Sequence, residues 1–389
     1  MCTVLFTKQE KGKMILSSGA NCAATPKLLD VLVVGGGLSG VMVAHELQHG
    51  VHPMTWNLLE ANTELGGRLM NDSKGHQIDM GGAWVWPSHQ PYMKKLISKL
   101  SIPTFTQPDD PSSTRIEGGA IRFVDTLAES LPKDQIKKGS AVVSCALDSI
   151  PSEKGPVVRV DTRDKESYFA RKVVFAVPPK ILSTKVKFDP PLSLEKQAAM
   201  ARSQTWMAGV TKVSLLYDKR FWDKGSSNSG LPSNAGPAFQ VYDASTKDAS
   251  VVALTFFAMV PPNSEASKDD AVLAEQCAAQ MQKLWGYFRL PRQAEQAKDY
   301  KDFHVQRWPK EEFISDDPNP VSVNPHPHPV RALSASEWNG ALLFAGTETD
   351  RGSPGVMEGA IGAALRVVQE LRDSVKKMAG IGSESSPSS

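Results

Sequence analysis

Three glycines near the start of the sequence have the spacing of a phosphate-binding turn. Gly35, Gly37 and Gly40 fit the pattern G-x-G-x-x-G, and they follow the apolar run VLVV and precede a stretch with helical periodicity. In this pattern the first glycine permits a tight turn, the second lets a pyrophosphate approach the backbone, and the third lets the helix pack on the strand. The free N–H groups and the positive dipole end of that helix attract phosphate. Because ordinary strand-to-helix turns also contain such glycines, the motif by itself leaves both interpretations open.

An acidic residue after the next apolar run favours the nucleotide interpretation. The segment TWNLLEA has the character of a second strand and contains Glu60. This residue lies about twenty positions beyond the last glycine, where a carboxylate can accept hydrogen bonds from both ribose hydroxyls of a dinucleotide. A carboxylate at this place argues against a phosphorylated ribose.

The composition excludes several classes of protein. A chain of 389 residues that is 41% hydrophobic can bury a large core, and its length indicates two domains or one unit with a large insertion. The net charge is only +2 and no basic stretch alternates with aromatic residues, so no nucleic-acid partner is expected. The cysteines lack C-x-x-C spacing, which favours a reducing compartment or inert thiols over a disulfide framework or a zinc site. They are Cys2, Cys22, Cys145 and Cys277.

The two ends of the chain have little folding signal. Residues 1–27 contain an apolar patch too short for a signal-peptide core and carry charges of both signs, so we expect a disordered leader, with an organelle transit peptide as the alternative. The compartment is accordingly cytoplasmic or organellar. Residues 377–389 are polar and rich in glycine and serine, which predicts a disordered tail. No apolar run has the length of a membrane span.

The remaining sequence predicts an interrupted α/β fold. Strand and helix patterns typical of a dinucleotide-binding fold occupy residues 28–185 and return at residues 336–376. Between them, residues 186–335 contain long alternating strands, namely TKVSLLYDKRFW, PAFQVYD and VVALTFFAMV, and one helix from DDAVLAEQ onwards. We therefore predict a discontinuous Rossmann-like nucleotide-binding domain with an inserted substrate domain built on a mixed or antiparallel β-sheet.

Several separated motifs, in this order, resemble those of the flavin-dependent amine oxidases of the monoamine-oxidase type. They are the glycine-rich turn, LEANTELGGRL, IDMGGAWV, VVFAVPP, VTKVSLLYDKRFW and LFAGTETDRGSPGVMEGAIGAA, and they extend from Leu29 to Leu371. The last two of these motifs serve no function in an ordinary nicotinamide dehydrogenase. The resemblance implies FAD as the cofactor and a small-molecule amine and oxygen as the substrates.

The resemblance also implies a cradle for FAD from both ends of the chain. The pyrophosphate would lie on the glycine-rich turn, Glu60 would bind the adenosine ribose, Arg68 would meet a phosphate or the adjoining loop, and Glu348 would meet the ribityl chain. The helix that opens at Val356 and Met357 would stabilise negative charge at the flavin pyrimidine. The complete implied set of cofactor-binding residues is Gly35, Gly37, Leu38, Ser39, Gly40, Glu60, Ala61, Gly67, Arg68, Gly82, Ala83, Trp84, Val142, Gly346, Glu348, Val356 and Met357.

Three of these assignments have simpler alternatives when the resemblance is set aside. Arg68 could be a surface ion-pair partner, Trp84 a core residue, and Glu348 a helix cap. The glycines beside Arg68 favour a contact with a phosphate over a surface ion pair for this residue.

Two residues are the candidates for a role beside the chemistry. Lys212 lies in an alternating apolar strand, where a lysine is usually on the solvent face. The resemblance implies instead that it points toward flavin N5 and holds a water, where a desolvated ammonium can support the reaction of reduced flavin with oxygen. Trp308 matches the family tryptophan that packs beside the isoalloxazine; the alternative is a tryptophan on a surface strand.

Departures from the family pattern bear on the substrate and the cofactor. One aromatic wall of the family's amine cage stands just before MEGA, where this chain has Val356, and the second cannot be placed in residues 313–330. No cysteine lies near that segment, so FAD is expected without a covalent link. Only TQPDDPSST stands between Phe105 and Arg115, where relatives insert helices, so the pocket is either wider or covered by a second copy of the chain in a homodimer. His326 and His328 lack further ligands, and we predict no metal site.

The implied reaction is hydride transfer from the carbon beside an amine to flavin N5, followed by transfer of two electrons to oxygen. The products would be an imine, hydrolysed to an aldehyde, and hydrogen peroxide. Two alternatives stay open: a flavin oxidoreductase of the same fold for a carotenoid, porphyrinogen or reduced nicotinamide, and a flavin-binding protein with an interaction role.

Overall fold

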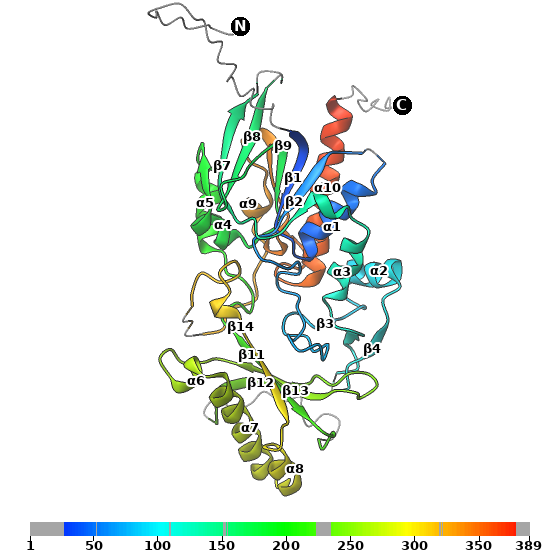
Figure 1. The fold of residues 1–389 in the computed structure, drawn as a ribbon, viewed down its shortest axis with the longest axis vertical. Coiled ribbons are helices and arrows are strands. Elements are labelled where there is room, and N and C mark those ends of the chain that lie inside the picture. Colours follow the sequence, from blue (N-terminus) through cyan, green and yellow to red (C-terminus); the bar gives the residue numbers. More distant parts are fainter. Residues whose placement is uncertain are drawn as a thin grey trace, which may run out of the picture.

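The fold is known from a computed structural model, which describes residues 27–51, 53–108, 110–150, 153, 155–222, 235–318, 320 and 322–378. Residues 1–26 and 379–389, which hold nearly all of the predicted leader and tail, lie outside the described residues. The tail was predicted to begin at residue 377, but helix α10 (Met357–Met378) includes that residue and the next. The molecule is long, with a large sheet at one end and an antiparallel sheet at the other (Figure 1).

The large sheet forms the nucleotide-binding part of the fold. Its strand order is β10-β7-β8-β9-β1-β2-β6, and β15 also pairs with β9. The strands of its parallel part are β1 (Leu28–Val34), β2 (Trp56–Leu59), β6 (Ile136–Lys137), β9 (Ser167–Phe175) and β15 (Leu342–Phe344). Since β1 runs parallel to both β2 and β9, the carboxyl ends of the three strands lie at one edge of the sheet, where nucleotides bind in such folds.

An antiparallel extension widens this sheet on its β9 side. Strands β7 (Val142–Ser149) and β8 (Pro156–Thr162) form a hairpin that continues from β9, and β10 (Lys187–Asp189) pairs with β7.

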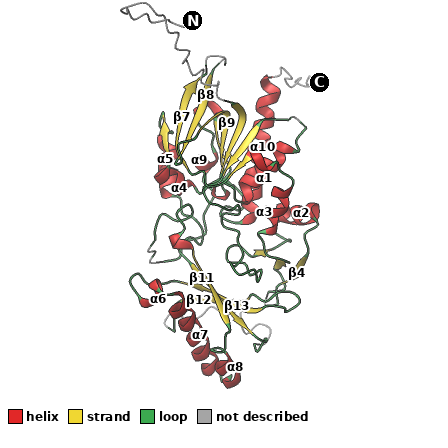
Figure 2. Ribbon diagram, in the orientation of Figure 1, coloured by secondary structure: helices red, strands yellow, loops and turns green. Residues whose placement is uncertain are grey.

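Helices cover both faces of the large sheet, as Figure 2 shows. Along β1, Val31 and Val33 pack toward α10 and three further helices, whereas Leu32 faces the opposite core. The helices on the first side are α1 (Leu38–Gln48), α2 (Pro91–Leu100) and α3 (Arg122–Glu129). The helices on the second side are α4 (Pro179–Lys185), α5 (Leu194–Arg202) and α9 (Arg331–Ser334). Apolar side chains thus alternate along a strand that is buried on both faces.

The second sheet is antiparallel, with the order β12-β13-β11-β14. Its strands are β11 (Thr211–Tyr217), β12 (Ala238–Asp243), β13 (Val252–Ala258) and β14 (Asp302–Arg307). Helix α7 (Asp270–Tyr287) packs on this sheet through a separate core, and α6 (Glu265–Lys268) and α8 (Pro291–Gln296) adjoin it. The sequence predicted α7 and the first three strands but missed β14, which completes the sheet beside β11.

Short elements connect the two sheets. A third, three-stranded sheet consists of β3 (Trp84–Val85), β4 (Thr104–Thr106) and β5 (Thr114–Ile116). The segment identified as shortened is the antiparallel pair β4–β5, in which Phe105 is opposite Arg115. Single 3-10 turns are η1 (Lys133–Gln135), η2 (Trp308–Lys310), η3 (Trp338–Gly340) and η4 (Thr347–Thr349).

The division between the two parts differs from the predicted boundary at residue 186. Strand β10 and helices α5 and α9 fall in the predicted substrate domain, but they join the large sheet because Leu192, Met200 and Leu333 pack in its second core. Conversely, Ile78 and Met80 from the nucleotide-binding part pack against Leu216 and Ala253 of the antiparallel sheet. Sequence order alone does not separate the two cores.

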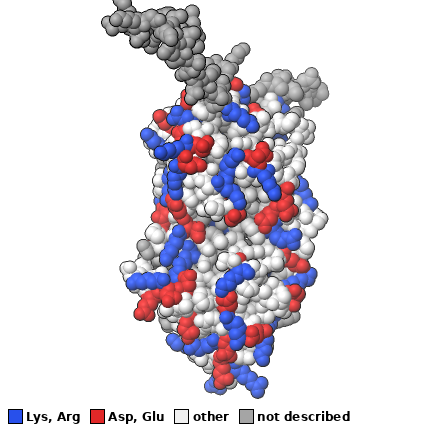
Figure 3. Space-filling view, in the orientation of Figure 1, with Lys and Arg blue, Asp and Glu red and all other residues white. Residues whose placement is uncertain are grey.

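The described surface and helices add two observations. On the face drawn in Figure 3, acidic and basic side chains are mixed, so this face has no broad field of one charge. Within the described ranges, every helix is too short or too polar to cross a bilayer.

Candidate functional site

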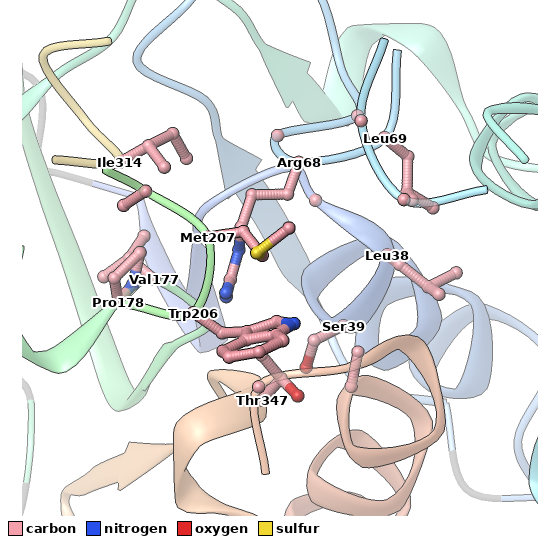
Figure 4. Close-up of a pocket in the computed structure, with 18 of the residues that line it drawn as sticks. Leu38, Ser39, Arg68, Leu69, Val177, Pro178, Trp206, Met207, Ile314 and Thr347 are labelled. Atoms are coloured by element: carbon pink, nitrogen blue, oxygen red, sulfur yellow. The ribbon is translucent and has the colours of Figure 1, made fainter. Parts of the chain in front are cut away.

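A cavity of about 590 Å³ opens between the large sheet and the antiparallel sheet, and we call it the central cavity. Figure 4 shows part of its wall, with Arg68, Trp206 and Ser39 around the open space. Sixteen of the predicted site residues line it: Gly35, Gly37, Leu38, Ser39, Glu60, Ala61, Gly67, Arg68, Gly82, Ala83, Trp84, Val142, Lys212, Trp308, Val356 and Met357. Gly40, Gly346 and Glu348 do not line it.

The glycine-rich turn contains glycines of two kinds. A methyl group on Gly40 would lie 1.8 Å from the carbonyl oxygen of Gly35, and Gly35 itself has a φ of +103°. These two glycines are required by the turn and by the packing of helix on strand. A methyl group on Gly37 would have no neighbour closer than 3.6 Å, although this residue lines the central cavity. Among the three glycines of the motif, Gly37 alone has space for a methyl group within the protein. The absence of a side chain there is compatible with the close approach of a pyrophosphate.

Glu60 follows β2 at the sheet edge and holds the turn in place. Its carboxylate accepts hydrogen bonds from the backbone N–H of Gly36 (2.6 Å) and of Asn62 (2.8 Å). The residue is buried, and this burial raises the pKa of its carboxyl above the ordinary value despite those hydrogen bonds. Glu60 is thus fixed with its carboxylate at the cavity wall, as a ribose ligand requires.

Arg68 and Glu348 form an ion pair. The Arg68 guanidinium donates to both carboxylate oxygens, and the Glu348 side chain is 1% exposed. Glu348 is not among the residues that line the central cavity, and its expected contact with the ribityl chain stays a prediction. Gly346 is also displaced from the wall; a methyl group there would lie 2.5 Å from the Val177 carbonyl oxygen. Thr347, between them, does reach the cavity.

Lys212 is buried in the centre of the site, not on a solvent face. Every residue of β11 is buried, and the Lys212 side chain enters the central cavity. Its Nζ donates to the Gly81 carbonyl oxygen at 2.9 Å and lies 5.3 Å from the ring centres of both Trp84 and Phe257. Burial lowers the pKa of Lys212 to about 8, although the negative charge of Asp79 opposes the shift.

Trp308 is also buried, and the surface alternative for it is wrong. It begins η2 directly after β14, and its Nε1 donates to the Met80 carbonyl oxygen at 3.0 Å. Met80 and Gly81 belong to the motif IDMGG. Lys212 and Trp308 therefore converge on two consecutive carbonyl groups, although they lie on different elements.

Sequence analysis predicted Trp84 as a site residue but missed the two aromatic residues beside it. The Trp84 ring lies 5.0 Å from Tyr242 and 5.9 Å from Phe257, centre to centre, and all three rings line the central cavity. Tyr242 and Phe257 come from β12 and β13, where their aromatic character also fits an ordinary core strand. Phe257 is directly opposite Lys212 in the sheet, a register that the apolar pattern of the sequence does not specify.

Two further wall residues were also missed. The indole of Trp206 enters the cavity in Figure 4 and stands beside Gly355, next to the position where the expected cage aromatic is replaced by Val356. Asp110, between β4 and β5, accepts a hydrogen bond from Trp86 Nε1 at 3.3 Å. Among the lining residues, Asp110 and Glu60 are the two acids.

Comparison with protein families gives two matches. A family described as flavin containing amine oxidoreductase matches residues 105–372, and an NAD(P)-binding Rossmann-like domain matches residues 33–100. Together the two matches include every residue that lines the central cavity, from Val34 to Ala360.

Individual relatives are distant. An amine oxidase [flavin-containing] of Danio rerio is 26% identical over 74% of this chain and 52% of its own length. A lysine-specific histone demethylase 2 of Homo sapiens is 26% identical over 56% of this chain and 26% of its own length. A probable flavin-containing monoamine oxidase A of Dictyostelium discoideum is 24% identical over 89% of this chain and 98% of its own length. The chain thus spans about half of the fish relative and a quarter of the human one.

Solved structures confirm the predicted fold. A triple mutant of putrescine oxidase has a TM-score of 0.70 at 16% identity, covering 89% of this chain and 99% of that one. A cyclohexylamine oxidase from Brevibacterium oxydans has a TM-score of 0.70 at 17% identity, covering 90% and 99%.

Proposed function

Because the chain belongs to the flavin containing amine oxidoreductase family, we propose that it is an FAD-dependent oxidase of small or polyamine-like amines. The observation that carries the proposal is the position of Lys212, a buried cation that faces the central cavity between two aromatic rings. A nucleotide-binding protein without redox chemistry has no evident use for a desolvated ammonium there.

The polar groups that line the central cavity suit FAD. The bare Gly37 and the start of α1 would receive the pyrophosphate, Glu60 the adenosine ribose, and Arg68 a phosphate. Ser39 is held by a hydrogen bond to the Ala345 carbonyl oxygen, which fixes the first turn of α1. The chemistry that FAD supplies when bound is acceptance of a hydride at N5 from the carbon beside a neutral amine and transfer of two electrons to oxygen, giving an imine and hydrogen peroxide.

The chain's own residues would select and orient the amine. Trp84, Tyr242 and Phe257 provide an apolar wall that favours an uncharged amine at the reacting end. Asp110 offers a carboxylate to a second, protonated amine at the other end of a diamine or polyamine. Lys212 would hold a water through the ammonium group that already donates to Gly81.

A panel of monoamines, diamines and polyamines tests the activity, with peroxide release as the readout. We expect peroxide with at least one member and a lower KM for diamines than for monoamines of equal length. Anaerobic bleaching of the bound flavin by a reduced nicotinamide or another non-amine donor, without peroxide from any amine, would favour the non-amine alternative. Bound flavin that no donor bleaches would favour a binding protein with an interaction role.

The cofactor is proposed to be non-covalent. Cys145 and Cys277 are buried and do not line the central cavity, and Cys2 and Cys22 lie outside the described residues. Precipitation with acid should release FAD into solution. Flavin that stays with the precipitated chain would contradict a non-covalent link.

The homodimer also stays a proposal. The β4–β5 pair is short, and Gln107, Asp110 and Ser113 at its turn line the cavity. Sedimentation of the holoenzyme, compared with the mass of 42.2 kDa for one chain, tests whether a second copy is present to cover this side.

A further inference from the structure

We propose that Asp72, His76 and His304 form a binding site for one divalent transition-metal ion, with zinc as the best fit. The sequence analysis predicted no metal site and did not consider these residues, because His304 lies 228 positions from His76. The fold brings them together at the junction of the loop before IDMGG with strand β14.

The three potential ligand atoms converge on one point. His76 Nδ1 lies 3.0 Å from His304 Nε2 and 3.2 Å from Asp72 Oδ1, and His304 Nε2 lies 3.5 Å from the same carboxylate oxygen. In a tetrahedral zinc site with bonds of about 2.0–2.2 Å, neighbouring ligand atoms are roughly 3.3–3.6 Å apart. Two imidazole nitrogens and one carboxylate oxygen, directed at one another at these distances, match three corners of such a site.

The carboxylate is held in place before any ion arrives. Its two oxygens accept hydrogen bonds from the backbone N–H groups of Lys74 (3.0 Å), His76 (3.1 Å) and Ile78 (3.0 Å). Such outer hydrogen bonds orient a metal ligand and keep it ionised. The same bonds would also serve a turn without any metal, so the experiment below includes that outcome.

The exposure of the three side chains and the charges around them allow an ion to reach the site. The side chains of Asp72 and His304 are 0% and 4% exposed, whereas that of His76 is 31% exposed. Entry and a water ligand at the fourth position are therefore expected on the His76 side. The nearby cation Lys74 is paired with Asp302 through both carboxylate oxygens, at 2.5 and 2.7 Å, which reduces its repulsion of a metal ion.

The site would connect the two parts of the fold next to the chemistry without entering it. None of the three residues lines the central cavity. The loop continues from Ile78 to Met80 and Gly81, and β14 continues from His304 to Trp308, which donates to Met80. A bound ion would thus fasten the backbone that receives Trp308 and Lys212, as a structural metal does. This role does not depend on the proposed activity.

Metal binding by the purified, tag-free holoenzyme tests the proposal. After dialysis against a chelator and then against Zn²⁺ at low micromolar concentration, elemental analysis should give one zinc per chain. Zn²⁺ should raise the melting temperature, and Co²⁺ should give the visible absorption of a tetrahedral site. His76→Ala, which changes a partly exposed side chain and so keeps the fold, should lower zinc affinity by more than about a hundredfold.

A matched control separates this site from general histidine binding. His89→Ala removes a histidine whose ring contacts Ser88 at the surface, and it should bind zinc and shift in melting temperature like the unaltered protein. Equal zinc affinity of His76→Ala and the unaltered protein would overturn the proposal. So would a protein that binds no zinc after dialysis, since the three residues would then be a hydrogen-bonded cluster only.

Discussion

Arg68 and Glu348, 280 residues apart in the chain, form a two-point ion pair with distances of 2.7 and 3.2 Å. Arg68 comes from the first half of the nucleotide-binding part and Glu348 from the segment that returns after the inserted sheet. The pair therefore joins the two chain segments of the discontinuous nucleotide-binding part beside the central cavity.

Glu348→Gln should lower the free energy of unfolding by about 1–2 kcal/mol, because it replaces a charge-assisted hydrogen bond between the buried Glu348 and the partly exposed Arg68 with a weaker one. Urea denaturation of the apoprotein measures this loss. Glu64→Gln is the control, since Glu64 pairs with Lys138 but its side chain is 81% exposed; it should cost less than about 1 kcal/mol. Equal stability of both variants would show that the buried pair contributes no more than a surface one.

Gly37→Ala should leave the apoprotein folded and weaken FAD binding by more than about tenfold, since the added methyl group has space in the protein and occupies the path of a pyrophosphate. Gly40→Ala should instead destabilise the fold by about 3 kcal/mol or more, because its methyl group meets the Gly35 carbonyl oxygen. Thermal denaturation and flavin titration distinguish the two. A Gly37→Ala protein with normal FAD affinity would contradict the assignment of this turn to the pyrophosphate.

Glu60→Gln should reduce FAD affinity by roughly 1.5–3 kcal/mol, because a neutral amide accepts more weakly from ribose hydroxyls. The amide also turns a donor toward the N–H of Gly36 or Asn62, so the apoprotein should lose some stability as well. Fluorescence titration with FAD, read beside the apoprotein melting temperature, separates the effects. Unchanged FAD dissociation with a lowered melting temperature would assign Glu60 to the turn alone.

Lys212→Met should slow the reaction of the reduced enzyme with oxygen by about 10²-fold while FAD remains bound, because a fixed positive charge stabilises negative charge that develops beside it. Stopped-flow reoxidation at several oxygen concentrations measures the second-order constant. Lys172→Met is the control: this half-buried lysine donates to the Gly340 carbonyl oxygen at 2.7 Å but does not line the cavity.

The second-order rate constant for the reaction of the reduced enzyme with oxygen should depend on pH in the unaltered enzyme. With the pKa of Lys212 at about 8, the ammonium is present below that pH and is lost as the pH rises through it. The oxygen reaction should therefore be fastest below pH 8 and fall above it, and the Lys212→Met profile should be flat in this range. A flat pH profile in both proteins would show that the charge of Lys212 does not affect the reaction with oxygen.

The sequence by itself determined the features that depend on neighbouring residues. The spacing of Gly35, Gly37 and Gly40 fixes a turn and the start of α1, because φ and close packing are decided within a few residues. The apolar alternation of β11, β12 and β13 and the helical period of α7 were readable for the same reason, and the order of the motifs identified the family and the α/β fold.

Only the tertiary structure decided where distant side chains meet. The alternation of β11 placed Lys212 on a solvent face, but the core under α7 covers one face of the strand and the IDMGG segment lies against the other. The ion pair between Glu348 and Arg68 also joins residues that no local pattern connects. Asp72 and His76 are neighbours in the sequence, but only the fold brings His304 to them. Such contacts depend on strand order and register, which a periodic pattern of apolar residues does not specify.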